Sequence, residues 1–251
     1  MPVLTDRQAM RALFHAVPQA DDEVAQLSWD ATGLRLRVLQ AGVILSELHL
    51  KPGAFTQGSF PDEFEVRVLA KHLRGALNTC IREDQTEPVK VEFTRLPNGL
   101  QIVVLTTPNR TTRKLGREGS SPIRMASLPT FEGAPRLSGL GYAVLEDGIT
   151  ALALLDMEYV VLRLGPAGLT LEAFPEFTPA SFFHAKQSTT MTGFSRITKV
   201  HLASVADFGA RHAILPTDLE VALLNEGLMR FTYALSEGTM TYWVQPRAPE
   251  I

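Results

Sequence analysis

Cysteine is almost absent from this chain of 251 residues, which contains a single one, Cys80. One cysteine cannot form an intrachain disulfide, so we expect an intracellular, reducing environment. Long apolar runs are also missing, since none approaches the roughly 20 residues that cross a membrane. The formal net charge of −3 argues against a protein that coats nucleic acid through its overall charge, but it leaves room for a local basic surface.

Recognisable catalytic motifs are missing as well. The chain has no Gly-x-Ser-x-Gly, no phosphate-binding loop and no Gly-x-Gly-x-x-Gly. Cys80 falls on the apolar face of a predicted helix, where a thiol is more typical of a core than of a nucleophile. The histidines are scattered, with no paired spacing for a metal; they are His15, His49, His72, His184, His201 and His212. We therefore expect no metal, no cofactor and no enzymatic activity.

What the chain does contain is a pattern that occurs twice. Trp29–Leu36 reads as a strand, a turn at Gly33 and a second strand. Leu162–Leu171 has the same form around Gly168, which lies 135 residues further along the chain (168 − 33). Two similar hairpins at this separation predict that one domain has been duplicated.

A second pair of hairpins keeps nearly the same separation. Val91–Leu100 turns at an Asn-Gly pair that ends in Gly99, and Val221–Leu228 repeats the form around Gly227, 128 residues later (227 − 99). Helix-like segments precede these hairpins, at Leu69–Thr79 and Leu202–Ala213. Each half therefore reads as helix, strands, helix, strands, which is typical of an α+β fold with largely antiparallel sheets.

The middle of the chain differs from both halves in composition. Thr107–Ser121 is polar, and Ser127–Ser138 contains both proline and glycine. Such a stretch predicts a linker between two domains. The predicted domains are residues 1–120 and 139–251, joined by a connector at residues 121–138.

Local signals give further predictions. Thr5 and Gln8 fit a capping box that begins the first helix, and Pro18 ends that helix. The second half is expected to start with a strand at Leu140–Leu145, followed by a short third helix at Ile149–Met157.

Taken in order, these segments resemble the sliding clamps of the proliferating cell nuclear antigen (PCNA) family, including PCNA-like checkpoint clamp subunits. Trp29-Asp30, which opens a strand before a glycine turn, is similar to the family's first strand pair. Leu228–Leu235, Gly238 and Tyr242–Pro246 are similar to its C-terminal strand, turn, strand and proline. The proline-containing linker between the halves also fits, and the resemblance runs nearly end to end.

The resemblance implies a fold and a function. Family members consist of duplicated DNA-clamp domains, with antiparallel sheets outside and two helices per domain inside. Three subunits close into a ring around duplex DNA without reading its sequence. The ring does no chemistry: it acts as a processivity factor that tethers polymerases and other peptide-motif proteins during replication and repair. A clamp loader and, in a eukaryote or a virus, a nuclear location are implied.

The resemblance also implies that the basic faces of the helices line the DNA-containing hole of the ring. Attraction to phosphate does not depend on base sequence and needs only lysine and arginine on that surface. The expected DNA-facing residues are Arg7, Arg11, Lys71, Arg74 and Arg211. The alternative is that these side chains lie on ordinary solvated helix faces. The predicted third helix has no lysine or arginine, so the lining would be less positive than in typical members.

Family clamps bind partner peptides in an apolar pocket beneath the interdomain linker, and such a cleft suits helix-like or extended ligands. The matching positions here are Leu39, Ile44, Leu128, Pro129, Trp243, Val244 and Pro246. Val244 could equally belong to the core. An apolar residue within the polar linker, such as Leu128, must pack against something.

Ring closure needs sheet edges that pair between subunits. By position, Pro122–Ser127 of one subunit would pair with Ser181–Gln187 of the next. The expected subunit-interface residues are Ile123, Met125, Phe182 and Phe183. For the two phenylalanines, a place in an ordinary strand core is the alternative.

Two other functions stay open at this point. The uneven basic lining also fits one subunit of a heterotrimeric checkpoint clamp. A viral-type processivity factor that forms no ring would instead hold DNA by a basic face, and its expected contact is the segment Arg110–Arg117.

Overall fold

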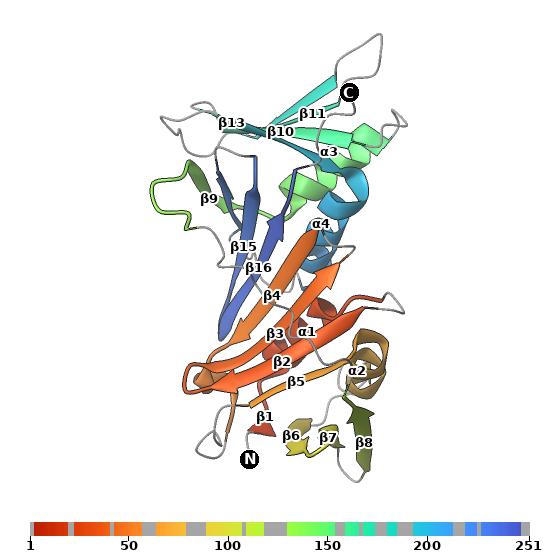
Figure 1. Ribbon diagram of the computed structural model, residues 1–251. Coiled ribbons are helices and arrows are strands. Elements are labelled where there is room, and N and C mark those ends of the chain that lie inside the picture. The colour runs from red at the N-terminus through yellow and green to blue at the C-terminus, as the bar shows by residue number, and fades with distance from the viewer. Residues whose placement is uncertain are drawn as a thin grey trace. The chain divides into compact units, whose positions relative to one another are not determined.

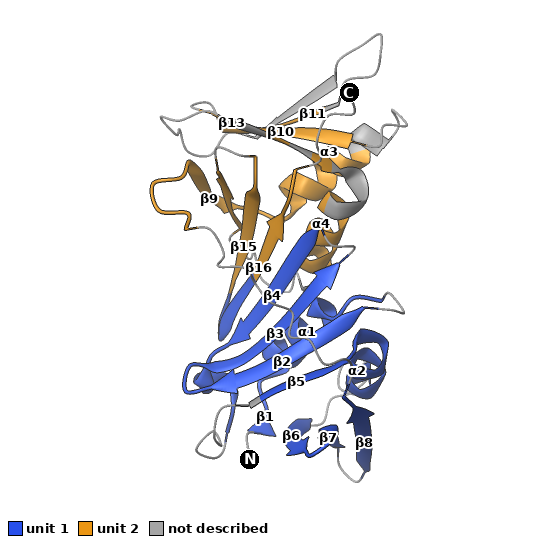
Figure 2. Ribbon diagram, in the orientation of Figure 1, with its two compact units in different colours: residues 1–126, 235–240 blue, residues 127–234, 241–251 orange. Residues whose placement is uncertain are grey.

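The structure is a computed structural model, and its chain divides into two compact units. Unit 1 comprises residues 1–126 and 235–240, and unit 2 comprises residues 127–234 and 241–251 (Figure 2). The structure describes residues 3–19, 23–40, 43–56, 64–78, 89–106, 109–117, 130–153, 159–165, 168–173, 180–184, 193–212, 219–224 and 227–246.

Unit 1 contains two helices, and its strands belong to two antiparallel sheets (Figure 1). Four strands lie in the order β5-β2-β3-β4 and four in the order β1-β6-β7-β8. The elements are β1 (Val3–Leu4), α1 (Arg7–Ala16), β2 (Val24–Asp30), β3 (Gly33–Gln40), β4 (Ile44–Leu50), the short 3-10 helix η1 (Pro52–Ala54), β5 (Phe64–Leu69), α2 (Ala70–Leu77), β6 (Lys90–Leu96), β7 (Gly99–Leu105) and β8 (Arg110–Gly116).

Unit 2 repeats this arrangement element by element. Its strand orders are β13-β10-β11-β12 and β9-β14-β15-β16, with α3 and α4 in the places of α1 and α2. The elements are β9 (Arg136–Leu140), α3 (Ala143–Ala153), β10 (Tyr159–Gly165), β11 (Gly168–Ala173), β12 (Ala180–His184), β13 (Gly193–Thr198), α4 (Lys199–His212), β14 (Leu219–Leu223), β15 (Met229–Leu235) and, from residue 241, the rest of β16 (Gly238–Val244). The predicted duplication and the α+β class are confirmed.

The first helix begins one residue later than the capping box predicts. Asp6, not Thr5, is the N-cap, and its carboxylate accepts a hydrogen bond of 2.7 Å from the backbone N–H of Ala9. Either residue type can cap a helix, so the sequence alone does not decide between neighbours. The buried face includes Met10, Leu13 and Phe14, as the periodicity predicts.

The glycine turns lie where the repeated pattern puts them. Gly33 and Gly168 have φ values of 126° and 127°, a region that side chains rarely adopt. A Cβ atom on Gly33 would also lie 2.0 Å from the carbonyl oxygen of Leu50. Both hairpins therefore require glycine for the backbone angle, and the first requires it for space as well.

Two predicted assignments in the middle of the chain are wrong. Part of the polar stretch assigned to the linker forms β8, in which Leu115 pairs with Leu100 of β7. Only Leu115 of β8 is buried, and a strand at a sheet edge needs little apolar character. The strand expected at Leu140–Leu145 is instead the end of β9 followed by α3, because the carbonyl of Tyr142 already accepts the N–H of Leu145.

Candidate interaction surfaces

The helices of unit 1 carry basic side chains and no acidic ones. Arg7 and Lys71 are exposed, and Arg11 is half-buried. Together α1 and α2 contain four lysines and arginines and no aspartate or glutamate, a net charge of +4. Within the described residues, neither Arg7 nor Arg11 forms an ion pair. These two guanidinium groups are thus available to an anionic ligand.

Arg74 lies elsewhere, although it belongs to the same helix pair. Its guanidinium donates hydrogen bonds to the carbonyl oxygens of Phe14 (3.3 Å) and Val17, at the C-terminal end of α1. The group also lies over the Phe14 ring, 4.2 Å from its centroid. Carbonyls at a helix end lack partners within the helix, and a cation there also complements the helix dipole. Arg74 therefore joins α2 to α1, and we leave it out of the candidate DNA-binding residues.

The helices of unit 2 have a different charge. Glu146 and Asp147 are exposed on α3, while Arg211 of α4 donates a 2.6 Å hydrogen bond to Asp207 one turn earlier. Counting Lys199 as well, α3 and α4 contain two lysines and arginines against three acidic residues, a net charge of −1. Arg211 remains exposed, but Asp207 offsets its charge.

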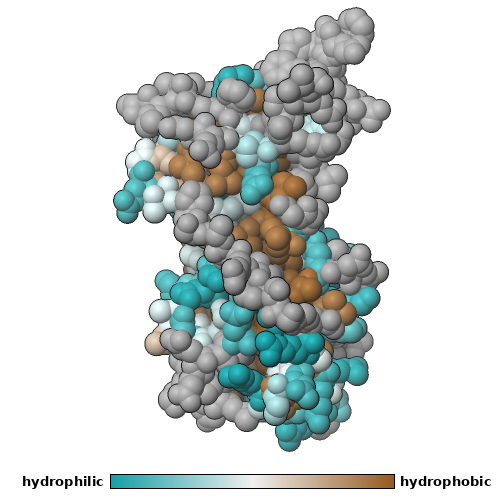
Figure 3. All heavy atoms as spheres, viewed as in Figure 1, coloured by the Kyte–Doolittle hydropathy of each residue, from teal (hydrophilic) through white to brown (hydrophobic). Residues whose placement is uncertain are grey.

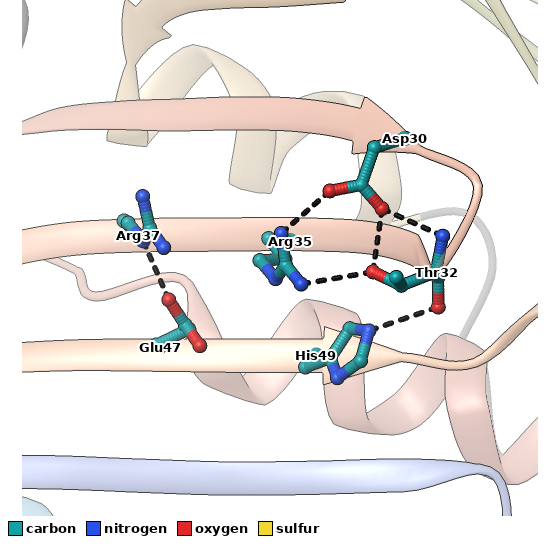
Figure 4. Close-up of polar contacts among 6 residues, drawn as sticks. All are labelled: Asp30, Thr32, Arg35, Arg37, Glu47 and His49. Atoms are coloured by element: carbon teal, nitrogen blue, oxygen red, sulfur yellow. Dashed lines mark hydrogen bonds and ion pairs between the residues drawn. The ribbon is translucent and has the colours of Figure 1, made fainter. Parts of the chain in front are cut away.

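The outer face of the sheet β5-β2-β3-β4 carries a polar network (Figure 4). Arg35 donates to Asp30 (2.6 Å) and Thr32 (2.8 Å), and a ring nitrogen of His49 lies 3.0 Å from the Thr32 carbonyl oxygen. Arg37 pairs with Glu47 across β3 and β4. The hydrogen bond from the Thr32 hydroxyl, and then its backbone N–H and Arg35, lowers the pKa of the Asp30 carboxyl.

Next to this network the same face becomes apolar. Leu39 of β3 is directly opposite Leu45 of β4, and Val24 of β2 is opposite Leu69 of β5. Leu39 is 43% exposed, and among the described residues it is the one large apolar side chain classed as exposed. We call Val24, Leu39, Leu45 and Leu69 the apolar stripe.

Ile44 does not belong to the apolar stripe, although it was expected beside Leu39. Ile44 is fully buried and pairs with Gln40, so it lies on the face of β4 opposite to Leu45. Successive residues of a strand point to opposite faces, so an error of one residue changes the face. Leu45, which the sequence reasoning missed, takes the expected place of Ile44; strand alternation was the signal that could have found it.

The structure describes only some of the remaining residues of the predicted peptide pocket. Leu128 and Pro129 lie outside the described residues. In unit 2, Trp243 and Pro246 are half-buried and Val244 is fully buried. The end of the predicted connector is anchored within unit 2, where Phe131 lies under the Arg230 guanidinium (4.7 Å).

The sheet edges of the described strands include β8 and β12. Among the described strands, β8 pairs only with β7 and β12 pairs only with β11. Phe182 and Phe183 belong to β12, opposite Leu171 and Thr170. Ile123 and Met125 lie outside the described residues, and β8 is one of the described sheet edges of unit 1.

Comparisons with solved structures decide the fold. One chain from a crystal structure of a PCNA2–PCNA3 complex from Sulfolobus tokodaii has a TM-score of 0.77 at 15% identity, and the match covers 98% of each chain. PCNA from Thermococcus kodakaraensis has a TM-score of 0.75 at 15% identity, covering 98% of this chain and 99% of the other. The chain has the fold of a PCNA sliding clamp. No family model and no curated protein matches the sequence.

The sliding-clamp fold explains the repeat that the glycine spacing predicted, since one α+β unit occurs twice. The repeat also accounts for β8. Because β16 follows β15 in unit 2, a corresponding strand is required after β7 in unit 1. Within the described residues, no three His, Cys, Asp or Glu side chains lie close enough to hold a metal ion. No helix in this part of the chain is long and apolar enough to span a membrane.

Proposed function

We propose that this chain is a subunit of a DNA sliding clamp, a trimeric ring that encircles duplex DNA and tethers replication and repair proteins. The observation that carries the proposal is the match to PCNA clamps over 98% of the chain at TM-scores of 0.75 to 0.77. The protein acts as a scaffold and not as an enzyme. Its partners are duplex DNA, bound without regard to sequence, a clamp loader, and polymerases and other proteins with short peptide motifs.

The charge of the helices supports contact with DNA mainly through unit 1. Arg7, Arg11 and Lys71 are the proposed phosphate-binding residues, and Arg211 is a weaker one because Asp207 pairs with it. Such contacts are individually weak and carry no sequence information. A ring that slides needs this combination, since encirclement and not tight binding retains it on DNA.

The apolar stripe supports a role in binding partner peptides. Exposed Leu39 and the half-buried side chains beside it form an apolar group on one sheet face, which favours docking of an apolar ligand. We propose Leu39 and Leu45 as contacts of the peptide, together with Trp243 and Pro246, and with Leu128 and Pro129 of the connector. Ile44 of unit 1 and Val244 of unit 2 are core residues by burial.

Ring closure is proposed at the edges β8 and β12. Pairing of edge strands between neighbouring subunits satisfies their free backbone groups and removes exposed edges. Ile123 and Met125, which lie outside the described residues, stay part of the proposed interface together with Phe182 and Phe183 of β12.

A retention experiment tests the proposed function. The assembled particle would be isolated from its own cells through an affinity tag on this chain and incubated with a nicked circular plasmid. A ring should stay with the circle through gel filtration and be released when a restriction enzyme linearises it. Equal retention on circular and linear plasmid would contradict encirclement and leave a protein that merely binds DNA.

A further inference from the structure

Residues 235–240, at the turn between β15 and β16, belong to unit 1, and we call them the clasp. The backbone N–H of Lys51 donates a 2.8 Å hydrogen bond to the carbonyl oxygen of Glu237. The Ser236 hydroxyl donates a 3.1 Å hydrogen bond to the side-chain oxygen of Gln8, in the first turn of α1. The clasp therefore contacts both the end of β4 and the beginning of α1.

Glycines let the clasp approach its neighbours closely. A Cβ atom on Gly238 would lie 2.1 Å from the carbonyl oxygen of His49 in β4, and one on Gly53 would lie 2.5 Å from Oε2 of Glu237. The Glu237 carboxylate can rotate away, but the backbone of β4 cannot. A larger residue at position 238 must therefore displace the clasp from β4.

A second set of contacts runs from the clasp to α1 through η1. The N–H of Ala54 donates to the carbonyl of Lys51 at 3.1 Å, and the N–H of Thr5 donates to the carbonyl of Ala54 at 3.4 Å. Thr5 precedes Asp6, the N-cap of α1. The clasp thus supports the beginning of α1 directly through Gln8 and indirectly through η1.

The beginning of α1 needs such support because of its charge. Arg7 is the first residue of the helix, and the first turn contains no acidic side chain. A cation at the positive end of the helix dipole destabilises the turn in which it lies, and the first N–H groups of a helix lack partners within it. Arg11 lies one turn further on, where the backbone is bonded within the helix. The position of Arg7 therefore depends more on contacts outside the helix than the position of Arg11 does.

We propose that the clasp positions Arg7 for its contact with DNA phosphate, with Ser236 and Glu237 as positioning residues that do not touch DNA themselves. This inference rests on the proposed clamp function. If the clasp only stabilised the fold, its displacement would lower stability and leave every phosphate contact in place. If it positions Arg7, its displacement removes the contribution of Arg7 and keeps that of Arg11.

The clasp lies away from the proposed peptide surface. It contacts Lys51, directly after the end of β4, whereas Leu45 of the apolar stripe is near the beginning of that strand. In Figure 3 the apolar surface of unit 1 lies towards the beginning of β4, and the described surface towards its end is mainly hydrophilic. A substitution in the clasp therefore leaves the apolar stripe unchanged.

The test compares Gly238→Ala in the wild-type chain and in the Arg7→Gln chain. A labelled duplex of about 30 base pairs is titrated at several NaCl concentrations, and one lost phosphate contact should lower the dependence of log affinity on log salt by about 0.9. At about 0.1 M NaCl this corresponds to binding about eightfold weaker. In the Arg7→Gln chain, Gly238→Ala should change neither quantity. Gly116→Ala, with nothing within 4 Å of its Cβ position, is the matched control and should bind as the wild type does.

Two further measurements accompany the titrations. Hydrogen exchange at the amides of Ala9 and Met10 should be faster in the Gly238→Ala protein, because the first turn loses its support. If circular dichroism shows that Gly238→Ala is unfolded, Ser236→Ala takes its place. That change should cause a smaller loss in the same direction, and Ser236→Thr, which keeps the hydroxyl, should restore wild-type binding.

Two results would overturn the proposal. One is an unchanged salt dependence in a folded clasp variant, and the other is an equal reduction in the wild-type and Arg7→Gln chains. Unchanged exchange at Ala9 and Met10 would likewise reject the role of the clasp and leave the clamp function intact. The duplex is linear, so failure of plasmid retention would reject the ring and leave this result standing.

Discussion

The two units solve the same packing problem in different ways. In unit 1 a long cationic side chain joins the helices, since Arg74 of α2 reaches the carbonyls at the end of α1. In unit 2 the close approach of the helix α4 to Tyr142, the residue that precedes α3, requires a glycine. A Cβ atom on Gly209 of α4 would lie 2.5 Å from Cβ of Tyr142. The comparison teaches that a basic residue on a clamp helix is not by itself a DNA contact, because one fold can use it for packing.

The largest effect is expected from filling the close contact in unit 2. Gly209→Ala should destabilise unit 2 by about 1 to 3 kcal/mol, because the added methyl group overlaps Tyr142 and Tyr233. Gly75→Ala on α2 is the matched control, since nothing lies within 4 Å of its Cβ position. That change should stabilise unit 1 by up to about 1 kcal/mol. Hydrogen exchange of peptides from each unit measures the change in stability that each substitution causes. Equal changes for Gly209→Ala and Gly75→Ala would contradict the proposed difference between the helix pairs.

Breaking the cationic link in unit 1 should have the next largest effect. Arg74→Met leaves the carbonyls of Phe14 and Val17 without the charged donor, at a cost of about 2 kcal/mol in unfolding free energy. Arg7→Met, at an exposed position of α1, should change stability by less than about 0.5 kcal/mol. Urea unfolding provides the comparison. An Arg74→Met protein of normal stability but weakened DNA binding would return Arg74 to the DNA-binding set.

The charge difference between the helix pairs predicts that the helices of unit 1 contribute more to DNA affinity than those of unit 2. Each phosphate contact contributes about 0.9 to the dependence of log affinity on log salt concentration. Arg7→Gln combined with Arg11→Gln should lower that slope by about 2, and Arg211→Gln by less than about 1 because Asp207 already pairs with Arg211. Titrations of duplex DNA at several salt concentrations give the slopes. Equal losses per residue would show that the ion pair in α4 does not matter.

The smallest effect concerns the equivalent hairpins β2–β3 and β10–β11. The first holds the Asp30 carboxylate with Thr32 and Arg35, whereas the second has a pair between Arg163 and Glu172 away from its turn. Because the folded-state pKa of Asp30 is lowered, its contribution to stability is present above its unfolded-state pKa and is lost as pH falls through the folded-state value. Thr32→Val should raise the Asp30 pKa, which carboxyl-carbon NMR would record. The Arg163→Gln protein should leave it unchanged.

Local patterns were enough to predict the repeat, the turns and the buried helix faces. Gly33 and Gly168 could be identified as turn residues because glycine readily adopts their backbone angles. The buried residues Met10, Leu13 and Phe14 of α1 could be identified because they have helical spacing. Features that depend on neighbours in space could not be predicted. β8 has one buried apolar residue, so its pairing with β7 left almost no periodic signal.

The site residues show the same limit. Leu39 was predicted only because its position matches the clamp family's peptide pocket. The face of Ile44 depended on the register of β3 against β4, which the sequence does not show. Arg74 looked like a solvent-facing cation, because its hydrogen-bond acceptors are 57 and 60 residues away in the sequence. Tertiary contacts of this kind carry no local signature.

Residues 235–240, which belong to unit 1, have a consequence for synthesis on the ribosome. The backbone N–H of Lys51 donates to the carbonyl of Glu237 at 2.8 Å, and the Ser236 hydroxyl bonds to Gln8 at 3.1 Å. The first 126 residues leave the exit tunnel long before these partners exist. Unit 1 therefore acquires its last contacts only after residues 235–240 have been synthesised.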